Sequence, residues 1–115
     1  MTVFNISNHL NQDYKQHLPK KGKLLAIDVG TKKIGIATCD ETRFLVTPKS
    51  IIQRQGDEKD FAKILEFIQQ NFIVAIVVGR PIRMDGAITQ MTLFSEKFAK
   101  NLDVFLEKKL PIFLF

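Results

Sequence analysis

Residues 24–40 read LLAIDVGTKKIGIATCD, which predicts two strands joined by a tight turn. The first strand, residues 24–29, is an apolar run interrupted by a single acid, Asp28. The turn consists of Gly30, Thr31 and Lys32. An apolar run without alternation is typical of a central strand that is covered on both faces. We therefore expect Asp28 to lie near the end of a buried central strand, with the other elements built around it.

The segments after this hairpin alternate between strand and helix patterns. Residues 44–52 are rich in strand formers but contain Pro48, which predicts an edge strand because proline cannot donate to a ladder. Apolar residues at helical spacing predict two helices, residues 57–71 and 88–109, with Asp57 capping the first. Two more apolar runs, residues 73–78 and 110–115, predict strands parallel to the first. The order β-β-β-α-β-α-β indicates a mixed α/β sheet with the first strand in the centre.

The two ends of the chain carry separate expectations. Residues 1–23 are mostly polar and are interpreted as a loose leader, although Val3, Ile6 and Leu10 have helical spacing. The folded domain is then residues 24–115. Its last residues, LPIFLF, would expose an apolar strand. We expect either that a C-terminal part of the domain is missing or that a partner covers this strand, including a second copy of the chain.

Composition narrows the class of partner and the compartment. The chain has 115 residues and a net charge of +5, which favours an anionic partner such as nucleic acid. Its one cysteine, Cys39, excludes an internal disulfide and fits a reducing cytoplasm. The apolar runs are too short to cross a bilayer, and the N-terminus lacks the pattern of a signal peptide. We expect a cytoplasmic protein without a membrane partner.

Asp28 is the main candidate for a functional carboxylate. A carboxylate in a buried strand loses hydration unless a metal ion or hydrogen-bond donors compensate. The alternative is an aspartate that caps the turn at Gly30. This turn could also bind phosphate, since glycine allows close approach, Thr31 offers a hydroxyl and Lys32 a positive charge. An ordinary hairpin with solvated lysines is the other interpretation of the same residues.

A second candidate cluster follows the strand at residues 73–78, where residues 79–86 read GRPIRMDG. The carboxyl ends of parallel strands meet at one edge of a sheet, and open α/β sheets bind ligands there. Four residues of this segment are therefore predicted to contact substrate on the same rim as Asp28: Arg80, Arg83, Asp85 and Gly86. The arginines could hold phosphates through paired hydrogen bonds. Asp85 could instead cap the helix that follows.

Three of these segments resemble one known family in order and spacing. AIDVGTKKIGIA (residues 26–37), GDEKD (residues 56–60) and IVVGRPIRMDG (residues 76–86) are similar to the YqgF family. Its members are described as Holliday junction resolvase-like nucleases and as pre-16S rRNA processing nucleases. The resemblance covers residues 24–115 and implies a ribonuclease H-like fold with strand order 3-2-1-4-5 and flanking helices. It also implies a cytoplasmic protein that processes the 5′ end of pre-16S rRNA by cutting structured nucleic acid.

The resemblance further implies phosphodiester hydrolysis with Mg²⁺ or Mn²⁺. Asp28 matches the first acid of the family and is thereby implied as catalytic residue and metal ligand. The next family acid lies in an Asp-Glu-Arg motif after the last strand, and another lies in a later helix. This sequence stops before both, and a two-metal site needs several carboxylates. If these residues are the whole protein, we expect little or no nuclease activity.

Other functions remain compatible with the sequence. Arg80 and Arg83 stand where the family usually has leucine and asparagine, which adds charge to the loop. The chain could be a catalytically inactive module that binds structured RNA or branched DNA, or a Holliday junction resolvase. A nucleotide phosphotransferase is a third class, because actin-like and sugar-kinase-like proteins share this core and its phosphate turn but need two such lobes. A fourth is an assembly protein that pairs through its last strand as a homo-oligomer.

Overall fold

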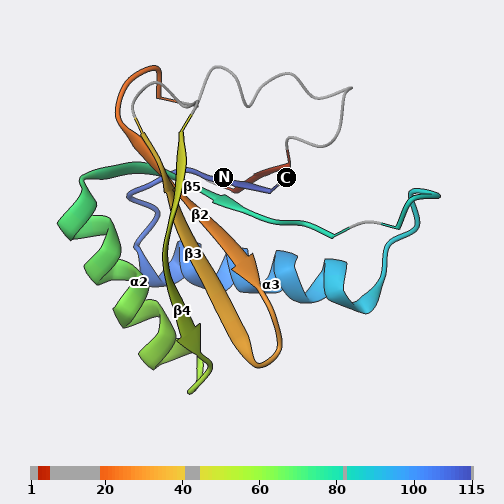
Figure 1. The fold of residues 1–115 in the computed structure, drawn as a ribbon. Helices are drawn as coiled ribbons and strands as arrows, with labels where there is room; N and C mark the ends of the chain where they lie inside the picture. Colours follow the sequence, from red (N-terminus) through yellow and green to blue (C-terminus); the bar gives the residue numbers. More distant parts are fainter. Residues whose placement is uncertain (1–2, 6–18, 41–44, 82, 115) are drawn as a thin grey trace.

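A computed structural model describes residues 3–5, 19–40, 45–81 and 83–114. Within these residues six strands form one sheet, in the order β1-β6-β5-β2-β3-β4. The strands are β1 (Val3–Asn5), β2 (Lys23–Val29), β3 (Lys33–Cys39), β4 (Val46–Gln53), β5 (Ile73–Val78) and β6 (Ile112–Leu114). The helices are α2 (Asp57–Asn71) and α3 (Gln90–Phe105). In Figure 1, α2 lies to the left of strands β2, β3 and β4, and α3 passes behind them.

The predicted arrangement of strands is confirmed. β2 pairs antiparallel with β3 and parallel with β5, so the strand that carries Asp28 is internal. Strands β4-β3-β2-β5-β6 give the order 3-2-1-4-5 when they are numbered along the predicted domain. β4 lies at an edge, as Pro48 predicts, and the ladder is irregular between Ile36 and Ala37, where Pro48 pairs.

The N-terminal residues correct two expectations. β1 pairs in parallel with β6, and Val3 lies opposite Ile112. Residues 3–5 are therefore part of the sheet and not of a loose leader. The last strand is not an open edge, and its three residues are buried. The backbone groups that we expected a partner to cover are paired by the chain itself, because residues 3–5 supply the neighbouring strand. Of the helix suggested by Val3, Ile6 and Leu10, Val3 lies in this strand and the rest lies outside the described residues.

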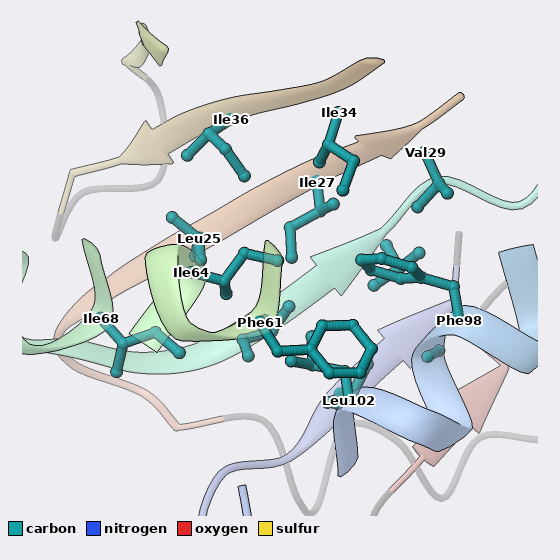
Figure 2. Packing of buried hydrophobic residues seen from close by; sticks show 14 of the residues in the cluster. Leu25, Ile27, Val29, Ile34, Ile36, Phe61, Ile64, Ile68, Phe98 and Leu102 are labelled. Carbon is teal, nitrogen blue, oxygen red and sulfur yellow. The ribbon is translucent and has the colours of Figure 1, made fainter. Parts of the chain in front are cut away.

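The main core lies between the sheet and its two helices. Alternate residues of a strand share a face, so Leu25, Ile27 and Val29 of β2 all point toward the helices. Figure 2 shows them with residues of both helices, among them Ile64 of α2 and Leu102 of α3. All five of these side chains are at most 5% exposed. The apolar faces of both helices therefore pack against the same face of the sheet.

The opposite face of the sheet is covered unevenly. Leu24, Ala75 and Phe113 form a smaller buried cluster there. Toward the carboxyl end of β2 the cover is lost, since Ala26 is half-buried and Asp28 is exposed. The expectation that β2 is covered on both faces is therefore right for its first half and wrong at Asp28.

The helices begin and end at different signals from those predicted. α2 spans the predicted residues, but its N-cap is Gly56, with φ of 118°, and not Asp57. α3 begins after Thr89, whose side chain and that of Thr92 bond reciprocally to the backbone at the helix start. It ends earlier than predicted because the backbone at Glu107 turns left-handed, with φ of 55°. Among the described helices, none is both long and apolar enough to cross a membrane.

Candidate active site

Asp28 stands on the open face of the sheet with glycines on both sides. Gly35 is its cross-strand partner on β3, and a Cβ added there would lie 3.6 Å from the Asp28 Cβ. On the β5 side, the Gly79 N–H donates to the Ile27 carbonyl over 2.9 Å, which brings Gly79 beside Asp28. Neither neighbouring strand places a side chain against the carboxylate. A ligand can therefore approach Asp28 across the sheet surface.

The carboxylate faces an open hollow of about 380 Å³ over β2, β3 and β4 and the end of β5. Apolar residues line most of it, including Ala37, Pro48 and Ile51, and among the described residues Asp28 is the one charged side chain in the lining. Within the described part of the chain, no cation or hydrogen-bond donor is paired with the Asp28 carboxylate. The predicted burial of Asp28 is wrong, so lost hydration is no reason to treat it as a functional carboxylate. The reason is instead that ligands can reach it.

The turn that follows Asp28 is held tightly while its side chains are exposed. The Gly30 N–H donates to the Lys33 carbonyl over 2.8 Å, which closes the turn. A Cβ on Gly30 would lie 2.7 Å from that same oxygen, so glycine is required by close approach and not by a positive φ. Thr31 and Lys32 are exposed at the same end of β2 as Asp28. The structure thus brings together Asp28, Gly30, Thr31 and Lys32.

Arg80 points toward helix α3. Its Nε donates to Glu96 Oε1 over 2.6 Å, and its side chain is only 10% exposed. The loop after β5 is also tied to α3 by Thr92, whose hydroxyl donates to the Pro81 carbonyl. A phosphate at Arg80 would have to replace Glu96. In this structure Arg80 anchors the loop.

Arg83, Asp85 and Gly86 form an exposed turn farther along the loop. Arg83 pairs with Asp85 over 2.9 Å, with side chains 64% and 56% exposed. Asp85 Oδ1 also accepts the Ala87 N–H, and Gly86 has φ of 83°. Asp85 therefore closes a turn, whereas Thr89 caps α3. Figure 1 shows the segment after β5 leading away from the sheet before it reaches α3. Arg83, Asp85 and Gly86 are not among the described residues that line the Asp28 hollow.

Arg54, at the end of β4, is a residue that the sequence analysis missed. Its Nε bonds to Asp60 over 3.0 Å and one of its terminal nitrogens bonds to Asp57 over 2.6 Å. Asp60 is fully buried and also accepts the Gln55 N–H over 3.1 Å. The acids lie three and six residues after the arginine, at the start of a helix. The sequence shows only this spacing. That Asp60 is buried, and therefore needs a paired cation, is seen in the structure alone.

A single carboxylate is compatible with one kind of metal site. Mg²⁺ commonly keeps several waters and is held by one or two carboxylates together with substrate phosphates. Asp28 is exposed, unpaired within the described residues and located in a hollow, so it fits that role. In the described ranges no three or more His, Cys, Asp and Glu residues gather into a metal site. The residues at hand would thus hold one ion through Asp28, with the other ligands supplied by water, substrate or residues outside those ranges.

Sequence comparison decides the family. A sequence model of RuvX, described as a Holliday junction resolvase, matches residues 22–115. The chain belongs to the RuvX family. The resemblance to the YqgF nucleases is thereby confirmed, because the match spans all three motifs on which it rests.

Curated relatives of this RuvX chain share the name "Putative pre-16S rRNA nuclease". One from Corynebacterium jeikeium is 43% identical over 82 residues, covering 71% of this chain and 53% of the relative. One from Zymomonas mobilis is 34% identical over 88 residues, covering 76% of this chain and 54% of the relative. The chain spans about half the length of the curated relatives that it matches.

Solved structures confirm the ribonuclease H-like fold. RuvC of T. thermophilus, in complex with a Holliday junction substrate, superposes with a TM-score of 0.58 at 11% identity. The match covers 82% of this chain and 64% of RuvC. The Pelota protein of Thermoplasma acidophilum reaches 0.56 at 10% identity, over 94% of this chain and 33% of Pelota. At such identities the similarity shows the fold alone.

Proposed function

We propose that this protein is a divalent-metal-dependent nuclease that hydrolyses phosphodiester bonds in structured nucleic acid. The observation that carries the proposal is the position of Asp28 in a RuvX chain. It is an exposed carboxylate at the end of the central strand, flanked by Gly35 and Gly79 and open to a ligand. Processing of the 5′ end of pre-16S rRNA is the proposed role, since curated relatives carry that name.

The proposed division of roles follows the geometry. Asp28 would hold a Mg²⁺ or Mn²⁺ ion, which stabilises developing charge on phosphate oxygens when it is bound. The exposed turn beside it would bind the nucleic acid backbone, with the Thr31 hydroxyl as a hydrogen-bond donor and the Lys32 ammonium as a cation. Arg83 is exposed enough to reach a second phosphate if it exchanges Asp85 for that anion.

A second candidate is a module of the same family that binds nucleic acid without cutting it. The observation that favours it is the composition of the site. Among the described residues Asp28 is not joined by two further metal-ligating side chains. The net charge of +5 supports binding to a polyanion independently of catalysis.

One experiment separates the two candidates. The purified chain is mixed with a labelled precursor 16S rRNA fragment and, separately, with a four-way DNA junction, with Mg²⁺, Mn²⁺ or EDTA. Binding is followed by fluorescence anisotropy across a salt series, and cleavage is followed on denaturing gels. Asp28→Asn removes the candidate ligand with little change in shape. Glu58→Gln, at an exposed position in α2, is the matched control for the change in charge.

The nuclease predicts metal-dependent cleavage that is lost in Asp28→Asn and kept in Glu58→Gln. Cleavage that survives in Asp28→Asn would refute the proposed role of the carboxylate. Binding with steep salt dependence but no cleavage by any variant would establish the binding module for this chain. If neither nucleic acid binds, both candidates are wrong. Preference for the rRNA fragment over the junction, or the reverse, assigns the substrate.

A further inference from the structure

Arg54 lies under the turn that follows Asp28 and is fixed from the helix side. Its side chain is 13% exposed, and its guanidinium bonds to Asp57 and to the fully buried Asp60. The guanidinium carbon also lies 5.6 Å from the Phe94 ring centre and 5.5 Å from that of Phe98. A planar cation held by two acids and two rings has little freedom to move. Arg54 is therefore a rigid point between the two helices and the sheet.

The same residue holds the turn in two places. The second terminal nitrogen of the guanidinium lies 3.4 Å from the Gly30 carbonyl oxygen. The backbone N–H of Arg54 donates to the Lys32 carbonyl over 2.9 Å. Both carbonyls belong to the turn whose first hydrogen bond, from Gly30 to Lys33, closes it. The side chain and the backbone of Arg54 thus connect the turn to the start of α2.

The orientation of Asp28 depends on this turn, because few contacts hold its own side chain in place. Its carboxylate is exposed and has no partner among the described residues, and the position beside it on β3 is a glycine. Its orientation is therefore set by the backbone at the end of β2. That backbone enters the turn two residues later, at Gly30.

We propose that Arg54 is a positioning residue for the Asp28 site, acting through the Gly30 turn. The proposal rests on the function proposed above and adds a group to it that does not line the Asp28 hollow. Outer-sphere partners that orient a metal ligand typically change metal affinity by about 10–100-fold when they are replaced. Arg54→Lys keeps the positive charge but loses the fork that reaches Asp60, Asp57 and Gly30 together. We expect its Mn²⁺ affinity to fall on the order of ten-fold.

The test uses the isotopically labelled chain and two NMR readouts that do not require activity. Mn²⁺ titration measures affinity through paramagnetic broadening of the amides of Asp28 and Gly30. Hydrogen exchange of the Gly30 amide measures how firmly its bond to Lys33 is held. Leu102→Val is the control for a general loss of stability, because Leu102 is fully buried in the core of α3.

Support requires weaker Mn²⁺ binding and faster Gly30 exchange in Arg54→Lys, with core amides of β5 still protected. Leu102→Val should keep the Mn²⁺ affinity and Gly30 exchange of the parent chain. Parent-like values in folded Arg54→Lys would overturn the inference and leave the proposed function standing. If the parent chain shows no broadening at Asp28, the proposed role of Asp28 as a metal ligand in the free chain fails, and Gly30 exchange still decides the role of Arg54.

A second variant covers the case in which Arg54→Lys does not fold. Asp57→Asn removes one acid from the guanidinium and leaves the bond to buried Asp60 in place. Faster exchange at Gly30 in Asp57→Asn supports the positioning role. Exchange at the parent rate in this variant overturns it.

Discussion

Replacing Gly35 by alanine should stabilise the fold and impair the site at the same time. Gly35 lies within β3, directly opposite Asp28. Its φ is not in the left-handed region, so alanine can adopt the same backbone. The added Cβ would meet the Asp28 Cβ at 3.6 Å, which is ordinary van der Waals contact. The strand therefore has room for the methyl group, but the carboxylate gains a neighbour on its open side.

The expected magnitudes follow from these contacts. Glycine in a strand costs roughly 0.5–1 kcal/mol relative to alanine, so Gly35→Ala should raise the free energy of unfolding by about that amount. A chain of 115 residues has an unfolding entropy of about 0.24 kcal/mol/K, so Tm should rise by about 2–4 °C. The methyl group excludes water from one side of Asp28. Mn²⁺ affinity should fall on the order of ten-fold, as for other changes next to a metal ligand.

Thermal denaturation by circular dichroism measures the first effect, and Mn²⁺ titration measures the second. Asp28→Asn supplies the control background, in which Gly35→Ala should have no further effect on Mn²⁺. A lower Tm would show that β3 cannot accept a Cβ at this position. A higher Tm with unchanged Mn²⁺ affinity would show that a metal ion does not reach the carboxylate over the open surface beside Gly35. That result would refute the proposed metal site at Asp28.

Three further results are expected. Asp60→Ala should lower the free energy of unfolding in urea by about 3–5 kcal/mol, because the mostly buried Arg54 guanidinium loses its fully buried partner. Asp57→Ala, at a half-exposed acid, should lower it by less than about 1 kcal/mol. Similar costs for the two variants would contradict this difference. Leu102→Ala should lower the free energy of unfolding by about 2–5 kcal/mol, and Val104→Ala, at an exposed position of the same helix, by less than about 0.5 kcal/mol. The reverse order would show that a different face of α3 packs against the sheet. Lys32→Ala should weaken RNA binding and reduce the slope of log affinity against log salt by about 1, while an unchanged slope would remove Lys32 from the phosphate contacts.

Local sequence patterns predicted most of the fold. Each element could be predicted from one pattern, because each pattern reflects short-range geometry within that element. These patterns are the apolar run around Asp28, the helical spacing in residues 57–71 and the position of Pro48. The parallel pairing of β2 with β5 also followed from the lack of alternation in both strands.

The pairing of residues 3–5 with β6 could not be predicted in the same way. Residues 3–5 are too short to show a strand pattern, and they form one only because β6 offers an unpaired edge. The exposure of Asp28 depends on which part of the sheet is left uncovered. The role of Arg54 depends on the meeting of β4, α2 and the turn after β2.

By itself, the sequence determined the order of elements, the central place of β2 and the choice of Asp28 as the carboxylate to examine, because periodicity and turn chemistry act within a few residues. Only the tertiary structure decided that β1 closes the sheet edge, that Asp28 faces solvent between two glycines and that Arg80 turns toward Glu96. Those outcomes depend on contacts between residues far apart in the chain. Burial and charge pairing are properties of the packed molecule, and no single segment carries them.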